Sequence, residues 1–350
     1  MKVALLGFEG DFSPNSGAGI QRYMYEIYNG LHSINKNIEK IEFRKIKFLS
    51  TGLSFAIKTL FTNFGEYDIV HNLMPTPFLN IKSIKRGDYK FITTAHDFQV
   101  LLYAQYTFDH GATLKDKLWI QLVIKSGYKT ILNSDFITAN STQTKEEAIK
   151  LGFDKNKIFV VNHGIDKRFM MPIHPKKNKD KFIVGYLGAM RKRKNLEFGI
   201  NAANAIKSKD IFFDIWGKKE FEYEYLVSIS KNKNINFKGF APEEKIVNIY
   251  DSFDAFIFPS YHEGFGLPIL EAQSRGLPVI IYKYGKIPKE IRKYCFEAES
   301  PEHMAQIIED LKKNGYNEKL RKRATEYAQS FTWERCALNT FKVYKKVLSL

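Results

Sequence analysis

Short apolar runs alternate with amphipathic helical segments along the whole chain, and they do so in two series. The first series predicts strands at residues 3–6, 69–71, 91–95, 136–139 and 159–161. The second series predicts strands at residues 182–187, 212–216, 235–237, 255–258 and 279–282. Strands separated by helices of this length indicate βαβ units, which build parallel sheets. We therefore expect an α/β protein made of two doubly wound parallel sheets in tandem.

A segment of prolines and lysines with little apolar content, residues 171–181, separates the two series and predicts a linker. At 350 residues the chain is too long for one ordinary core, and 44% apolar residues suffice for two. We expect domains at 1–172 and 173–331, followed by a last amphipathic helix at 332–350. Other helices are expected at Tyr23–Leu31, Lys115–Lys129, Leu196–Ile206, Glu220–Ser230, Glu243–Tyr250 and Ile269–Arg275.

Composition limits where the protein acts and what it binds. No apolar stretch approaches the ~20 residues that a membrane-spanning helix needs, and Met1–Phe8 predicts a strand rather than a signal peptide. The only cysteines, Cys295 and Cys336, lack metal-ligand spacing, so we expect a reduced, cytoplasmic setting and no metal site. The net charge of +16 is spread over both halves. This charge indicates either an ordinary solvated surface or a surface that attracts nucleotide phosphate or an anionic membrane.

The most specific motif places two glutamates eight positions apart. Glu263 and Glu271 belong to the run Phe-Pro-Ser-Tyr-His-Glu-Gly-Phe-Gly-Leu-Pro-Ile-Leu-Glu, which follows the predicted strand ending at Phe258. Pro268 suits the first turn of a helix, and Gly264 and Gly266 allow the loop backbone to approach a ligand. One carboxylate then lies on the loop and the other about one turn into the helix. A ligand across this edge would meet both.

A basic loop follows the first strand of the second series. The run from Gly185 to Asn195 ends in Arg193-Lys194-Asn195, just before a predicted helix. Two cations beside the free N–H groups of a helix start suit a diphosphate. A solvated basic loop is the alternative, and the position between strand and helix favours phosphate binding.

Two further features follow strands of the first series. Gly17 and Gly19 open the first helix, but Arg22 stands where a dinucleotide fingerprint requires glycine. His96 lies in the run Thr93-Thr-Ala-His-Asp97 at the end of a predicted strand. A catalytic role and a structural role are equally compatible with this position. His71 has a similar place with less support. We find no zinc spacing, Walker lysine loop or Ser-His-Asp order.

Together these motifs resemble the retaining glycosyltransferases of family 4, which have the GT-B fold of two Rossmann-like domains facing across a cleft. The glycine loop, the His-Asp step, the Arg-Lys-Asn loop and the Glu-x7-Glu run occur in the family's order. Further segments are similar to family signatures: Asn140-Ser-Thr, Val161-Asn-His-Gly-Ile-Asp166 and Phe331-Thr-Trp-Glu334. In such enzymes the last helix crosses back to the first domain.

The resemblance implies transfer of a hexose from a nucleotide-diphosphate sugar, with retained configuration, to a glycan or lipid-linked acceptor. By the same resemblance Arg193, Lys194, Gly17 and Gly19 bind the donor diphosphate and Glu271 the ribose. The backbone of Gly264, Phe265, Gly266 and Leu267 addresses the sugar and phosphates, and Phe240 the base. His96 and Glu263 are the expected catalytic residues, which orient the sugar rather than attack it. No cofactor is implied beyond the nucleotide sugar as substrate.

Two departures from the family pattern affect these assignments. Ala189 stands where many relatives have arginine after the glycine at 188, so Arg191 or Arg193 would replace it. The loop after Tyr282 is short and lysine-rich, so recognition of the far end of the donor can differ. The Arg-Lys-Asn form leans toward mannosyl-type relatives.

Other functions stay open on the sequence alone. A GT-B sugar-nucleotide epimerase or phosphorylase would bind the diphosphate similarly without this Glu-x7-Glu loop. A non-catalytic anion-binding protein would use the net charge, whereas nucleic acid is not an expected partner. The segment Lys115–Lys129 mixes lysines with apolar residues. It would either rest on a membrane, at the inner face, or pack in the core with its lysines in solvent.

Overall fold

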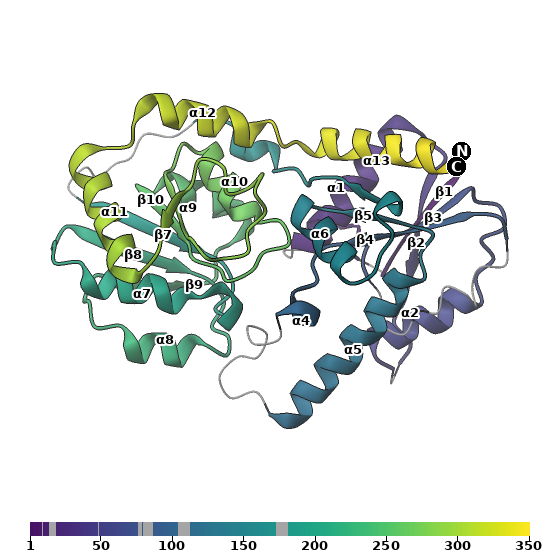
Figure 1. Cartoon of the computed structure of the whole chain (residues 1–350), viewed down its shortest axis with the longest axis horizontal. Helices are drawn as coiled ribbons and strands as arrows, with labels where there is room; N and C mark the ends of the chain where they lie inside the picture. The colour runs from purple at the N-terminus through teal and green to yellow at the C-terminus, as the bar shows by residue number, and fades with distance from the viewer. Residues whose placement is uncertain are drawn as a thin grey trace. The chain divides into compact units, whose positions relative to one another are not determined.

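The computed structural model describes residues 1–8, 10–13, 19–47, 49–75, 79, 87–103, 113–172 and 181–350. The chain forms two compact units (Figure 1). Unit 1 comprises Met1–Leu102, Thr113–Gly164 and Phe331–Leu350, and unit 2 comprises Tyr103–Ala112 and Ile165–Ser330. Most of the linker predicted at 171–181 lies outside the described residues.

The sheet of unit 1 has six parallel strands in the order β2-β1-β3-β4-β5-β6. Its strands are β1 (Val3–Phe8), β2 (Ile38–Phe43), β3 (Ile69–Asn72), β4 (Lys90–Ala95), β5 (Phe136–Ala139) and β6 (Ile158–Val160). Strand β1 is central, since Val3 is in register with Ile38 on one side and Ile69 on the other. The order reverses between β1 and β3, which makes this the switch point of the sheet.

Helices cover both faces of this sheet. They are α1 (Gly19–Ile34), α2 (Thr51–Leu60), α4 (Gln99–Leu102), α5 (Leu114–Leu132), α6 (Thr142–Lys150) and α13 (Trp333–Leu348). Helix α13 packs against α1 (Figure 1). A Cβ on Gly30 would lie 2.6 Å from that of Ala337, so the two helices approach at a glycine. Residues from both ends of the chain, such as Val3 and Val347, therefore share one core.

The sheet of unit 2 is also six-stranded and parallel, in the order β12-β11-β10-β7-β8-β9. Its strands are β7 (Phe182–Leu187), β8 (Ile211–Trp216), β9 (Ile235–Gly239), β10 (Ala255–Phe258), β11 (Val279–Tyr282) and β12 (Phe296–Ala298). The order reverses between β7 and β10. The loops after these two neighbouring strands therefore emerge at one edge, where α/β sheets bind ligands.

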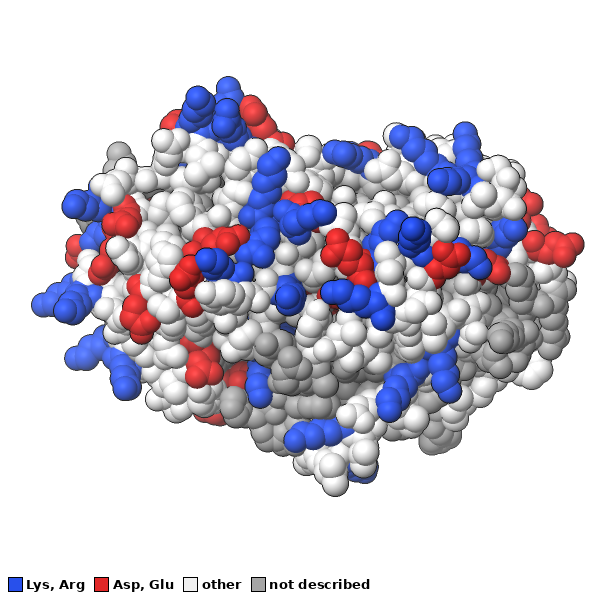
Figure 2. All heavy atoms as spheres, in the orientation of Figure 1, with Lys and Arg blue, Asp and Glu red and all other residues white. Residues whose placement is uncertain are grey.

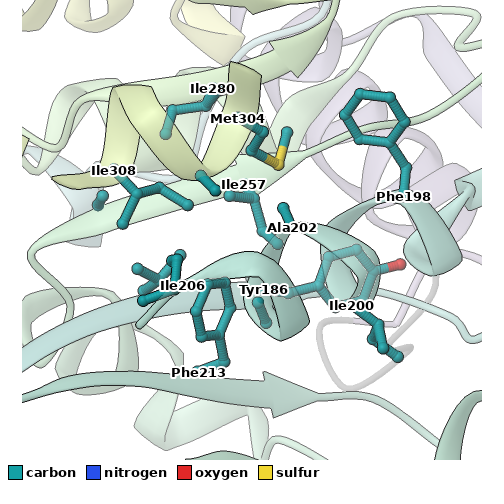
Figure 3. Close-up of a cluster of buried hydrophobic side chains, with 14 of the residues drawn as sticks. Tyr186, Phe198, Ile200, Ala202, Ile206, Phe213, Ile257, Ile280, Met304 and Ile308 are labelled. Atoms are coloured by element: carbon teal, nitrogen blue, oxygen red, sulfur yellow. The ribbon is translucent and has the colours of Figure 1, made fainter. Parts of the chain in front are cut away.

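The helices of unit 2 bury an apolar core against this sheet. They are α7 (Leu196–Ala205), α8 (Tyr223–Ile229), α9 (Ile246–Asp251), α10 (Leu267–Ser274), α11 (Pro301–Asn314) and α12 (Glu318–Gln329). Figure 3 shows Phe213 of β8 and Ile257 of β10 among the side chains of α7 and α11. Gly185 of β7 has no room for a side chain, because a Cβ would lie 2.1 Å from the ring of Phe253.

The predicted α/β class and both parallel sheets are confirmed, whereas the edge strands β2 and β12 and the helices α2, α6, α11 and α12 were not predicted. The edge strand β2 was not predicted, because Glu39 and Lys40 interrupt its apolar residues and face solvent. The edge strand β12 has only three residues. The helix expected at 243–250 divides into a short 3-10 turn, η5 (Glu243–Lys245), and α9. Within the described part of the chain, no helix combines the length and apolar content needed to cross a bilayer.

Candidate active site

Two of the predicted loops lie next to each other at the switch point of unit 2. After β7 the chain forms the 3-10 turn η4 (Lys192–Lys194) and enters α7. After β10 it runs through Pro259–Gly266 and enters α10, with Pro268 in the first turn. Because β7 and β10 are neighbours in the sheet, the cations of the first loop and the carboxylates of the second loop are brought to one edge.

Lys194 and Glu263 form a buried ion pair at this edge. The Lys194 ammonium donates to Glu263 Oε1 over 2.7 Å, and their side chains are only 10% and 8% exposed. Arg193 Nη1 lies 3.6 Å from the other carboxylate oxygen and is 34% exposed. The cluster of two cations and one carboxylate keeps a net positive charge. Its half-buried member, Arg193, is within reach of an anion from solvent.

The cations keep Glu263 ionised although the carboxyl is buried. Burial is the largest single influence and would raise the pKa of Glu263. The charges of Lys194 and Arg193, with the hydrogen bond from Lys194, outweigh it, so the pKa lies below its usual value. A carboxylate in this state can accept hydrogen bonds and stabilise positive charge, but it is not poised to act as an acid.

Backbone hydrogen bonds fix three loops in register around this pair. The Tyr261 N–H donates to the Arg193 carbonyl over 2.9 Å, and the Lys286 N–H donates to the Tyr261 carbonyl over 2.7 Å. The Glu263 N–H donates to the Lys286 carbonyl over 2.8 Å. A Cβ on Gly285 would lie 2.3 Å from the Ser260 carbonyl oxygen, so this approach requires glycine. The short lysine-rich loop after β11 is thus a structural part of the glutamate loop.

Two residues with positive φ lie where these loops enter their helices. Asn195 adopts φ 49° between η4 and α7, and its amide donates to the Pro259 carbonyl over 3.1 Å. Asparagine tolerates this conformation better than most residues, so it both ends the basic loop and ties it to the glutamate loop. Gly266 adopts φ 104° immediately before α10, where glycine is strongly favoured.

Glu271 is held by a different partner. The Tyr250 hydroxyl of α9 donates to Glu271 Oε2 over 2.9 Å, and Glu271 is buried. One turn later, Arg275 makes a paired hydrogen bond to Asp251, with both N–O distances 2.7 Å. The Arg275 guanidinium also donates to the carbonyls of Phe169, Met171 and Pro172. Helix α10 is therefore fastened to α9 by two adjacent side-chain contacts.

The structure distinguishes the two candidate arginines. Arg191 Nε donates to Glu220 over 2.6 Å, and its guanidinium lies over the ring of Phe221. Arg193, by contrast, lies beside Glu263. Of the two, Arg193 has the position next to the carboxylate of the glutamate motif.

Phe240 lies at the same edge of the unit 2 sheet. It is 61% exposed and follows Gly239, which ends β9 with φ 77°. The Gly217 N–H donates to the Gly239 carbonyl over 2.8 Å, which connects the loops after β8 and β9. An exposed aromatic ring at a strand end offers a flat apolar surface for stacking.

In unit 1, His96 follows β4 and is neutral. Its Nε2 lies 2.9 Å from the Leu73 carbonyl oxygen, so Nε2 carries the proton and Nδ1 is the acceptor. Burial lowers the pKa of His96, against smaller opposing effects of this hydrogen bond and of Asp97. The ring packs on the edge of Tyr23, at 5.1 Å between centroids, and Tyr23 stacks on His163 at 4.6 Å.

His71 belongs to a closed buried network instead. Its Nδ1 lies 2.6 Å from the Tyr344 hydroxyl of α13, and its Nε2 lies 2.9 Å from Thr94 Oγ1. Burial lowers the pKa of His71 to about 3. Both ring nitrogens are used within the protein, so His71 connects the C-terminal helix to the sheet and is not available for chemistry.

Two family profiles match adjacent parts of the chain. The profile of "Glycosyltransferase Family 4" matches residues 32–169, and that of "Glycosyl transferases group 1" matches residues 168–331. The point where the two matches meet is close to the passage from unit 1 to unit 2 at Gly164. The chain belongs to glycosyltransferase family 4.

Individual members of family 4 are distant from this chain. The O-antigen chain mannosyltransferase B of Escherichia coli is 28% identical over 170 residues, which is 46% of this chain and 45% of the relative. The D-inositol 3-phosphate glycosyltransferase of Paenarthrobacter aurescens is 24% identical over 61% of this chain and 58% of the relative. Both alignments therefore span less than two thirds of the relative's length.

Solved structures of other proteins share the fold of this chain. The sucrose-phosphate synthase of Thermosynechococcus elongatus has a TM-score of 0.76 at 18% identity, covering 100% of this chain and 99% of that one. HepE of Anabaena, solved in complex with UDP and glucose, has a TM-score of 0.66 at 16% identity, covering 100% of both chains. Identities of this size show the fold alone, and that fold is GT-B.

The structure brings Arg193, Lys194 and Glu263 of the predicted set into one cluster, and it gives Glu271 a separate partner. Gly17 lies outside the described residues, and Gly19 is the first residue of α1. Phe265 and Gly266 are buried, and Leu267 is half-buried, all at the entry of α10. Among the described residues, no group of three metal-ligating side chains occurs.

Three residues around the glutamate loop of unit 2 were not predicted from the sequence: Tyr250 supports Glu271, Arg275 supports α10, and Gly285 permits the loop contact. In unit 1, the stacking of His163 on Tyr23 was not predicted either. His163 stands inside a run already recognised as a family signature, which was the available signal. Tyr250 and Arg275 look like ordinary helix residues in the sequence, because their partners are distant along the chain.

Proposed function

We propose that this protein transfers a hexose from a nucleotide-diphosphate sugar to a glycan or lipid-linked acceptor, with retention of the anomeric configuration. Membership of glycosyltransferase family 4 supports this class of reaction. The single observation that carries the proposal is the buried Lys194–Glu263 pair, with Arg193 beside it, at the switch point of unit 2.

Arg193 and Lys194 hold the donor diphosphate in this proposal. An ammonium has three N–H donors, so Lys194 can bond Glu263 and a phosphate oxygen together. Each charge-assisted bond contributes roughly 1.5–3 kcal/mol. The same bonds grow stronger as the diphosphate departs and gains charge, which lowers the barrier. Gly19 and Gly17 are assigned to the diphosphate on the family resemblance.

Glu271, Phe240 and the loop backbone hold the rest of the donor. Glu271 accepts hydrogen bonds from the ribose hydroxyls. The Tyr250 hydroxyl fixes one of the Glu271 carboxylate oxygens in place for this role. The exposed ring of Phe240 receives the base. The backbone of Gly264, Phe265, Gly266 and Leu267 addresses the sugar and its phosphates. We assign residues 173–331 to the donor and residues 1–172 to the acceptor, with 332–350 completing the acceptor domain.

Neither expected catalytic residue acts as a nucleophile. Glu263 stays ionised and orients the sugar hydroxyls. His96 is neutral, and its Nδ1 can accept a hydrogen bond from the sugar. The acceptor hydroxyl attacks from the side of the leaving group, and a donor phosphate oxygen takes its proton. No covalent intermediate and no metal ion enter this mechanism.

The donor is proposed to be a nucleoside diphosphate hexose, with UDP-glucose and a nucleoside diphosphate mannose as the first candidates. HepE was solved with UDP-glucose, and the E. coli relative in sequence is a mannosyltransferase. A panel containing UDP-glucose, UDP-galactose, UDP-N-acetylglucosamine and GDP-mannose distinguishes them by thermal stabilisation and by release of the nucleoside diphosphate. Consumption of the donor only when a glycan or lipid-linked acceptor is added identifies a transferase. Conversion of the donor without acceptor would instead identify an epimerase.

A further inference from the structure

His96 is held in place by neutral, buried side chains of unit 1. The surface of the chain is different, since Figure 2 shows charged side chains of both signs intermixed over the face it draws. The side chain that bonds the His96 backbone is Asn140, which is 3% exposed. His96 directly follows β4, and Asn140 directly follows β5. Because Ala95 and Ala139 are in register, the two residues lie side by side at the ends of neighbouring strands.

The Asn140 side chain continues the pairing of these strands by one residue. The Asn140 N–H donates to the Ala95 carbonyl over 3.4 Å, and Asn140 Nδ2 donates to the His96 carbonyl over 2.9 Å. A carbonyl oxygen only accepts, so the amide nitrogen must face it. The amide oxygen accepts from Thr144 Oγ1 of α6 over 2.9 Å. Both ends of the amide are therefore used, and its orientation is fixed.

The start of helix α6 does not require the Asn140 side chain. Ser141 is the N-cap of α6, and its hydroxyl accepts from the Thr144 N–H over 3.0 Å. Asn162 Nδ2 donates to the Asn140 carbonyl over 3.0 Å, which holds the Asn140 backbone independently of its side chain. The Asn140 amide has a different role, which is to join Thr144 to the backbone of His96.

Other groups hold the His96 ring itself. Its Nε2 donates to the Leu73 carbonyl over 2.9 Å, which leaves the lone pair on Nδ1. The ring packs on the edge of Tyr23, and its centroid lies 5.5 Å from that of His163. The bond from Asn140 fixes the backbone from which this ring extends. A shift of that backbone would stretch the bond to Leu73 and with it the selection of the tautomer.

We propose that Asn140 is a positioning residue, which directs Nδ1 of His96 toward the donor sugar by fixing the His96 carbonyl beside β5. The inference rests on the proposed role of His96 in orienting that sugar. Asn140 does not touch the reacting atoms and acts only through His96. Misplacing an orienting group by a fraction of an ångström slows turnover, here by about tenfold.

A double-mutant cycle with the full chain and the best donor of the panel tests whether Asn140 acts through His96. We expect N140A to lower kcat by about tenfold and H96A to lower it at least as much. The double variant N140A/H96A should turn over as slowly as H96A and no slower, because no ring is then left to position. Thermal stabilisation by the matching nucleoside diphosphate should be unchanged in N140A, since Arg193 and Lys194 are intact.

An asparagine elsewhere in unit 1 provides the matched control. Asn35 Nδ2 donates to the Met1 carbonyl over 3.0 Å, so N35A also loses one bond from an amide to a backbone carbonyl. Its kcat should equal that of the unchanged protein. The thermal midpoint of each variant shows whether the fold is kept. N140D retains the shape of the side chain without an N–H donor, and it takes the place of N140A if the alanine variant does not fold.

Nitrogen NMR of the histidine side chains provides a measurement independent of turnover. The signal of His96, identified by its absence in H96A, should show the proton on Nε2 in the unchanged protein and a mixture of tautomers in N140A. An unchanged tautomer in N140A overturns the inference alone, as does a double variant about tenfold slower than H96A. Normal turnover in H96A overturns the proposed role of His96 and the inference with it.

Discussion

The Lys194 ammonium donates directly to the Glu263 carboxylate over 2.7 Å, and both side chains are almost completely buried. The basic loop and the glutamate loop therefore meet through side chains as well as through their backbones. A carboxylate in a site proposed to bind a diphosphate would normally repel it. Here two cations neutralise that carboxylate and leave one positive charge in excess.

Removing one partner of this pair should damage both stability and turnover. Lys194→Met removes the nearer of the two cations beside a buried carboxylate, and breaking a buried pair costs about 3–5 kcal/mol. Loss of a cation that stabilises the leaving diphosphate should also lower kcat by roughly a hundredfold or more. Chemical unfolding and donor turnover measure the two effects separately.

The double variant K194M/E263Q separates the two effects. With both charges gone, most of the lost stability should return, because no unpaired buried charge remains. Turnover should stay low, because the diphosphate ligand is still missing. If the double variant regains turnover along with stability, then the pair has only a structural role.

Tyr250→Phe should weaken donor binding more than it slows the chemical step. The hydroxyl fixes one oxygen of Glu271, and its removal costs about 1 kcal/mol of stability. We expect the donor KM to rise several-fold with kcat little changed, and Glu271→Gln to act in the same direction. Steady-state kinetics with the best donor of the panel measure this. A fall in kcat at unchanged KM would argue against the ribose assignment.

Gly285→Ala should disturb the glutamate loop without unfolding the protein. The new Cβ would lie 2.3 Å from the Ser260 carbonyl oxygen, so the loops at 285 and 260 must separate. Donor turnover should fall at least tenfold, since small misplacements in a site are costly. Gly87→Ala is the control, because its Cβ would meet only ordinary contacts of 3.5 Å or more. Equal turnover in both variants would contradict the expected role of the loop contact.

Unit 1 should lose stability as the pH falls below neutrality. The pKa of His71 is lowered from 6.5 to about 3 by burial. Its neutral form therefore stabilises the fold fully above pH 6.5, and that contribution is lost as the pH falls toward 3. From pH 7 to pH 5 the loss is about 2 kcal/mol from this group. The free energy of unfolding measured across this range should fall less steeply in His71→Gln than in the unchanged protein.

Sequence patterns predicted the sheets and the main loops well, for identifiable physical reasons. Fully buried strands such as β10 form continuous apolar runs, and a loop between such a strand and a proline-started helix has few alternative structures. The Glu263 and Arg193 loops were therefore located correctly. The edge strand β2 was missed because two of its six residues, Glu39 and Lys40, are exposed and interrupt the apolar pattern.

Long-range contacts between side chains could not be predicted in the same way. Nothing near Lys194 in the sequence shows that Glu263, 69 positions later, is its partner. The ion pair of Arg275 with Asp251 and the contact of Gly285 with Ser260 likewise depend on how segments distant in the sequence meet. His96 and His71 differ in their hydrogen-bond partners, which are the Leu73 carbonyl for His96 and the Tyr344 hydroxyl for His71. Only the folded chain brings these partners near the two histidines.

The core of unit 1 combines Val3 and Leu5 with Trp333, Tyr344 and Val347. During synthesis, the amino-terminal unit therefore cannot finish packing until residues beyond 331 have emerged from the ribosome. The residues from 165 to 330 meet no such delay. The nascent chain would thus complete its second unit before its first, and a chain interrupted before α13 would leave apolar surface of the first unit uncovered.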